Sequence, residues 1–92
     1  MTDVATFQNA LIHWRACTIL KLLPDGHRNT AYLIECQGER LVAKSTRRSP
    51  EALAWLAPVH DLAEAAGFLV PRLVPSVDGR LVVSGITVEK FL

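Results

Sequence analysis

The feature that most constrains the fold is a pair of β-rich runs separated by three residues. Residues 30–36 (TAYLIEC) and 40–45 (RLVAKS) are rich in β-branched and apolar side chains, and Gln37-Gly38-Glu39 lies between them. So short a connection containing Gly predicts a β-hairpin with a three-residue loop. Further strands are expected over residues 18–23, 80–84 and 86–91. We therefore expect an antiparallel sheet of about five strands.

Two helices are expected to pack on this sheet. Val4, Phe7, Leu11 and Trp14 recur at helical spacing, which predicts an amphipathic helix over residues 4–15. Ser49-Pro50-Glu51 predicts the start of a central helix, because Ser caps free N–H groups, Pro suits the first position and Glu complements the dipole. This helix should end near Gly67, and Pro58 should kink or divide it. The predicted class is α+β.

Length, charge and cysteine content exclude several kinds of protein. A chain of 92 residues with a net charge of +1 indicates one small domain over residues 1–92, without the bulk charge of a nucleic-acid or polybasic membrane binder. The apolar run from Ala52 to Val59 is too short to span a membrane, and the N-terminus lacks a signal core, so we expect a cytoplasmic protein. Cys17 and Cys36 are too few for a disulfide framework and are expected to be small core residues.

Three features are candidates for chemistry. The turn around Gly26 could bring backbone N–H groups to a phosphate, although on the loop alone an ordinary hairpin turn is the favoured interpretation. Lys44 ends an otherwise apolar strand, so it either reaches solvent, which is the commoner case, or binds an anion. Glu51 could steady that lysine or simply favour its helix N-terminus. Metal ligation is not expected of His13, His27 or His60, whose spacing fits no metal cluster.

The order of these signals is more specific than any one of them. Gly26 to Ile34, Arg40 to Lys44, Gly67 to Pro71, Asp78-Gly79-Arg80 and Thr87 to Leu92 follow one another along the chain. In this order the chain resembles the N-terminal lobe of the aminoglycoside phosphotransferase family, the small-molecule relatives of protein kinases. The resemblance covers residues 17–92 and ends at the hinge that joins the two lobes of such kinases.

The resemblance implies an ATP site. Gly26, His27, Arg28 and Asn29 would form the loop over the phosphates. Lys44 would pair with the α- and β-phosphates, and Val42 would lie against the adenine. Glu89, Lys90 and Phe91 would begin the hinge, with Val88 at the back of the pocket. The family's helix glutamate is not at the expected position, which falls near Ala57 or Pro58; Glu51 lies about two turns earlier and could share that face.

The resemblance assigns no catalytic residue to this chain. The catalytic-loop Asp and the metal-binding Asp of the family lie in a C-terminal lobe, so Mg²⁺ is expected only with that lobe and the chain alone should catalyse nothing. The expected partner is such a lobe or a self-associating copy, and the phosphate acceptor stays open. A second hypothesis is a free-standing interaction module that dimerises or docks a partner through its hinge edge. A third is an unrelated α+β domain.

Overall fold

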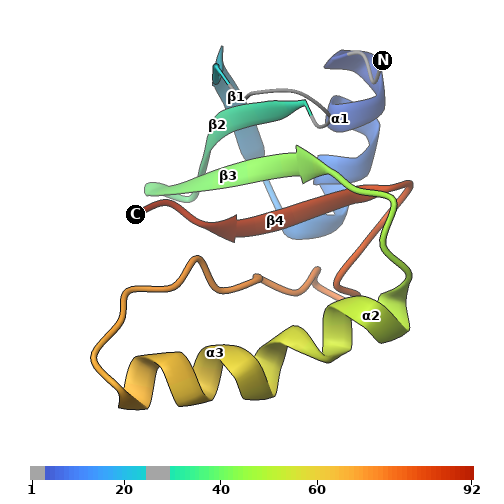
Figure 1. Ribbon diagram of the computed structural model, residues 1–92. Helices are drawn as coiled ribbons and strands as arrows, with labels where there is room; N and C mark the ends of the chain where they lie inside the picture. Colours follow the sequence, from blue (N-terminus) through green and yellow to red (C-terminus); the bar gives the residue numbers. More distant parts are fainter. Residues whose placement is uncertain (1–3, 25–29) are drawn as a thin grey trace.

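A computed structural model describes residues 4–24 and 30–92 of the chain (Figure 1). Within these residues an antiparallel sheet of four strands has the order β1-β2-β3-β4. The strands are β1 (Cys17–Leu22), β2 (Ala31–Cys36), β3 (Glu39–Ser45) and β4 (Ile86–Lys90). The helices are α1 (Val4–Leu11), the short 3₁₀-helix η1 (Ile12–Trp14), α2 (Pro50–Ala54) and α3 (Leu56–Ala65). The predicted α+β class is confirmed.

The predicted hairpin is present, with a shorter loop than expected. Pairing of β2 with β3 extends to Cys36 and Glu39, which leaves two residues in the turn. Both have positive φ, 53° at Gln37 and 85° at Gly38. Two-residue turns with this backbone match the twist of a hairpin, and Gly38 adopts it without the steric cost that a side chain brings.

The prediction of a strand over residues 80–84 is wrong. Only Val83 pairs there, in an isolated bridge to Ile86 across a turn at Ser84-Gly85. Residues 76–80 form a compact local turn instead, closed by a hydrogen bond of 2.9 Å from Gly79 N to Ser76 O. Besides β3, β4 also pairs with the short segment 72–74, through the Leu73–Glu89 bridge and a hydrogen bond of 2.7 Å from Val74 N to Val88 O.

The hydrophobic core lies between α1 and one face of the sheet. Among its fully buried side chains are Phe7 of α1, Ile34 of β2, and Ile86 and Val88 of β4. The rings of Phe7 and Tyr32 pack edge to face with their centroids 4.8 Å apart, a favourable aromatic geometry. The N-terminal helix forms as predicted, but its last turn tightens into η1.

The state of the two cysteines differs from the expectation that they are simply small core residues. Both contact the core as predicted, but they are joined to each other in a disulfide. Cys17 and Cys36 are directly opposite in the β1–β2 register, with Cα atoms 4.2 Å apart. Their sequence separation of 19 residues does not reveal this pairing, because the register that brings them together is set by the fold.

Local signals in the central helix act as predicted. The Ser49 side chain accepts a hydrogen bond of 3.1 Å from Ala52 N and caps α2. The segment is divided just before Pro58, as predicted, into α2 and α3. Pro58 lies in the first turn of α3, where its missing N–H costs least. Gly67, with φ 92°, follows the end of α3. No helix among the described residues is long and apolar enough to cross a membrane.

Candidate functional site

The sheet face that turns away from α1 carries charged side chains. Side chains alternate along a strand, so Leu41 and Ala43 enter the α1 core while Val42 and Lys44 face the opposite side. On the neighbouring strand β4, Ile86 and Val88 enter the core. By the same alternation, Thr87 and Glu89 share the face of Val42 and Lys44.

Lys44 and Glu89 form an ion pair on this face. The Lys44 Nζ lies 3.0 Å from Glu89 Oε1. The register pairs Val42 with Glu89 and Lys44 with Thr87, so the two charged residues are diagonal neighbours across β3 and β4. The Glu89 side chain is 11% exposed and that of Lys44 is 42% exposed. A carboxylate this buried needs a partner, and Lys44 supplies it.

A cavity of about 190 Å³ lies beside this pair. It is lined by three leucines, Leu53, Leu56 and Leu73, and by the charged or polar residues Lys44, Ser45, Thr46, Arg48, Thr87 and Glu89. Arg48 forms no ion pair with any other described residue. The cavity is therefore lined by two cationic residues and one carboxylate.

An ion-pair cluster holds α3 near this cavity. Arg72 pairs with Asp61 and Glu64 of α3, with a hydrogen bond of 2.7 Å from Arg72 Nε to Glu64 Oε1. Hydrogen bonds to Glu64 and Asp61 raise the pKa of Arg72 above its ordinary value. Because Leu73 follows directly, the same contact fixes one wall of the cavity relative to α3.

The predicted site residues do not all meet at this cavity. Lys44 and Glu89 meet, and Val42 shares their face with 8% of its surface exposed. Val88 is fully buried in the α1 core, so it does not reach the cavity. Glu51 is exposed on α2 and forms no ion pair with another described residue, so Glu89 takes the place beside Lys44 that Glu51 was considered for. Phe91 is 47% exposed after the end of β4.

The loop residues Gly26, His27, Arg28 and Asn29 lie outside the described residues. The structure places two side chains at the cavity that the sequence did not assign to it. Glu89 was expected at the start of the hinge, and Arg48 was not among the candidate residues. The β3–β4 register would have identified Glu89, but no local pattern in the sequence reveals that register.

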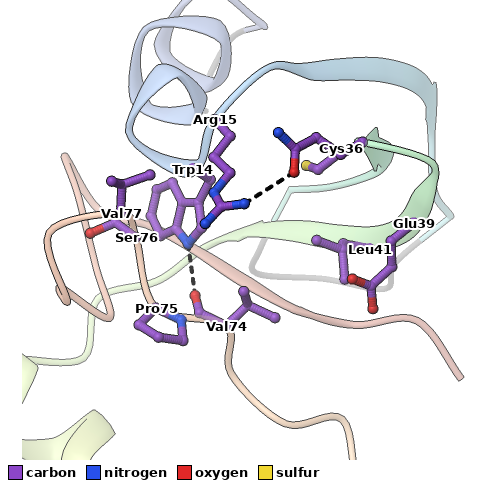
Figure 2. Close-up of a pocket in the computed structure, with 10 residues that line it drawn as sticks. Trp14, Arg15, Cys36, Glu39, Leu41, Val74, Pro75, Ser76 and Val77 are labelled. Carbon is purple, nitrogen blue, oxygen red and sulfur yellow. Dashed lines mark hydrogen bonds between the residues drawn. The ribbon is translucent and has the colours of Figure 1, made fainter.

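A larger cavity of about 350 Å³ lies between η1, the β2–β3 turn and the segment 74–77 (Figure 2). Its polar groups already bind one another. The Trp14 indole N–H donates to Val74 O at 2.7 Å, and Arg15 donates to Gln37 at 3.1 Å. Glu39, also on its wall, pairs with Lys90 at 2.6 Å. The Lys44 cavity is the better candidate site, since Arg48 has no such partner within residues 4–24 and 30–92.

The described residues offer no metal centre. No group of three or more His, Cys, Asp or Glu side chains among residues 4–24 and 30–92 could hold a metal ion. Comparison with protein-family models, with characterised proteins and with solved structures finds no match to this chain. The chemistry of the site therefore has to be judged from its own residues.

Proposed function

We propose that this chain is an ATP-binding lobe of a kinase-like phosphotransferase and that the Lys44 cavity holds the phosphates of the nucleotide. The observation that carries the proposal is the arrangement of Lys44 and Arg48 at one apolar-walled cavity. Lys44 acts as a compact cation, and the Arg48 guanidinium can bind phosphate oxygens with two parallel N–H groups. Val42 lies on the same sheet face, but with 8% of its surface exposed it would contact the adenine over a small apolar area only.

The volume of the cavity limits the size of the ligand that it can hold. At about 190 Å³ it is smaller than the roughly 300 Å³ at which small-molecule sites begin, so it accepts a polyphosphate chain rather than a whole nucleotide. The base and sugar would then lie outside the cavity. The hydroxyl-bearing substrate and the group that accepts its proton belong to a C-terminal lobe in this proposal.

Mg²⁺ does not fit the described residues alone. The cavity has one carboxylate, Glu89, and Lys44 already neutralises it at 3.0 Å. A magnesium ion in kinases bridges phosphates and carboxylates, which requires further acidic ligands that the described residues lining this cavity do not provide. The chain by itself is therefore proposed to bind nucleotide weakly and to transfer no phosphate.

The proposal places the chain in the cytoplasm, where ATP is abundant. Thiols are kept reduced in that compartment, so Cys17 and Cys36 would be present there mainly as a dithiol. The disulfide in the structure would then be the oxidised form of the same pair.

The second candidate function, an interaction module, has one observation in its favour. Large apolar side chains are exposed along the α2–α3 segment and after β4: Trp55, Val59, Leu62, Phe91 and Leu92. The hinge edge itself is partly covered, because Lys90 N donates to Arg72 O at 2.8 Å. A partner would therefore contact apolar side chains rather than add a strand along the full length of β4.

Calorimetric titration with ATP tests the primary proposal. Lys44→Met is expected to weaken binding about tenfold or more, whereas Lys21→Met, on the exposed strand β1, should change it less than about twofold. Arg48→Gln leaves the Lys44–Glu89 pair intact and should also weaken binding, which covers the case in which Lys44→Met unfolds. Equal affinities for all four proteins would refute the site.

A further inference from the structure

We propose that Glu89 competes with the phosphate ligand for Lys44 and so sets which anions the cavity accepts. The inference rests on the proposed function, because it concerns the same cavity. It assigns to Glu89 a positioning role on Lys44 that the family resemblance does not imply.

The two members of the pair differ in how firmly they are held. Glu89 lies on β4 between β3 and the bridge to Leu73, and its side chain is 11% exposed. Lys44 has a long flexible side chain that is 42% exposed. An arriving phosphate would therefore move the lysine ammonium and leave the carboxylate where it is.

Moving Lys44 has a cost. It leaves the Glu89 carboxylate with its negative charge in a poorly solvated position and without its cation. The phosphate must make up for that loss, so the ion pair weakens anion binding at this site.

The remaining charges around the cavity decide which anions can still bind. The charged groups that line it are Lys44, Arg48 and Glu89. A single phosphate that contacts only one cation gains too little binding free energy to offset the loss of the Lys44–Glu89 ion pair. A polyphosphate can contact Arg48 and Lys44 at the same time, so Glu89 favours di- and triphosphates over monophosphate. The substrate class of the site is thus a polyphosphate.

The experiment uses the full chain and titrates it with inorganic tripolyphosphate and with orthophosphate. Glu89→Gln should bind tripolyphosphate about tenfold more tightly than the wild type, and should gain at least as much for orthophosphate. Glu39→Gln is the matched control: it removes the same charge from an exposed pair with Lys90 and should change either affinity less than about twofold. Circular dichroism confirms that each variant is folded.

A second measurement reports on Glu89 without any ligand. An NMR scalar coupling across the hydrogen bond between Lys44 Nζ and the Glu89 carboxylate should be present in the free protein and disappear as tripolyphosphate saturates it. A purely structural role for Glu89 would leave that coupling unchanged by ligand.

The outcomes separate the two proposals. Binding by the wild type with no gain in Glu89→Gln over Glu39→Gln would overturn the competition and leave the anion site standing. Absence of saturable binding by the wild type and by Glu89→Gln would overturn the proposed function itself, and the competition with it. Tighter binding in Glu89→Gln alone, with loss of the coupling on titration, is the result we expect.

Discussion

The two faces of the sheet are built differently. The face toward α1 is dry, with Phe7, Ile34, Ile86 and Val88 fully buried. On the other side, Leu53 is the buried residue of α2. Helix α3, whose residues are all described, has no buried residue. That side also carries the Lys44–Glu89 pair and its cavity. The face toward α1 therefore holds the main apolar core, whereas the opposite face combines the buried side chain of Val42 with a charged pair beside a cavity.

The position of α3 extends this contrast. In Figure 1, α3 runs below the sheet, and the chain that follows it passes between the helix and β4. The helix is connected to that returning segment by the charged contacts of Arg72 with Asp61 and Glu64. A helix attached mainly by exposed ion pairs contributes little to global stability and opens easily.

The largest expected effect tests the dry face. Phe7→Ala should lower the free energy of unfolding by about 4 kcal/mol, because it removes a fully buried ring and leaves a cavity. Leu62→Ala, at a side chain 74% exposed on α3, should change it by less than about 0.5 kcal/mol. Urea denaturation measures both, and similar losses for the two variants would contradict the proposed division between the faces.

Reduction of the disulfide should have the next largest effect. Cys17 and Cys36 close a loop with a sequence separation of 19 residues, and opening a loop of that size should cost about 3 kcal/mol. Thermal unfolding with and without dithiothreitol measures the loss. The double variant Cys17→Ala/Cys36→Ala is the control, since its melting temperature should not respond to the reductant. If dithiothreitol also left the melting temperature of the wild type unchanged, the disulfide would not stabilise the fold.

Loss of the α3 contact should have a local effect. Arg72→Met should speed amide hydrogen exchange in α3 and leave α1 unchanged, because the charged contacts of Arg72 hold only the former. High salt should reproduce part of this change in the wild type by screening the same pairs. Faster exchange in α1 as well would show that the two sides of the sheet are more strongly coupled than we infer.

The smallest effect concerns pH. The hydrogen bond from Ser76 lowers the pKa of Asp78 below its ordinary 3.8, and the charge of Arg80 adds to this. A depressed folded pKa stabilises the native state above the ordinary value, and this contribution is lost as pH falls through the folded pKa. The wild type should therefore exceed Asp78→Asn in melting temperature above pH 3.8, with a gap that narrows below it. A gap independent of pH would assign the effect to packing.

Local features such as helix caps and helix ends could be predicted from the sequence, whereas contacts between residues far apart in the sequence could not. The cap at Ser49, the division at Pro58 and the helix end at Gly67 each depend on a few neighbouring residues. The disulfide and the Lys44–Glu89 pair depend on strand register, which brings residues far apart in sequence together. The strand expected over 80–84 does not form, because Val83 pairs only with Ile86 across the local turn at Ser84-Gly85.

Mapping the ATP site by NMR tests the central claim most directly. The amide spectrum of the full chain is recorded during titration with ATP, and the shifted residues are located on the structure. The account predicts shifts concentrated at Val42, Lys44, Arg48, Thr87 and Glu89, all lost in Lys44→Met. Shifts centred instead on the Trp14 cavity, or none at saturating ATP, would contradict it.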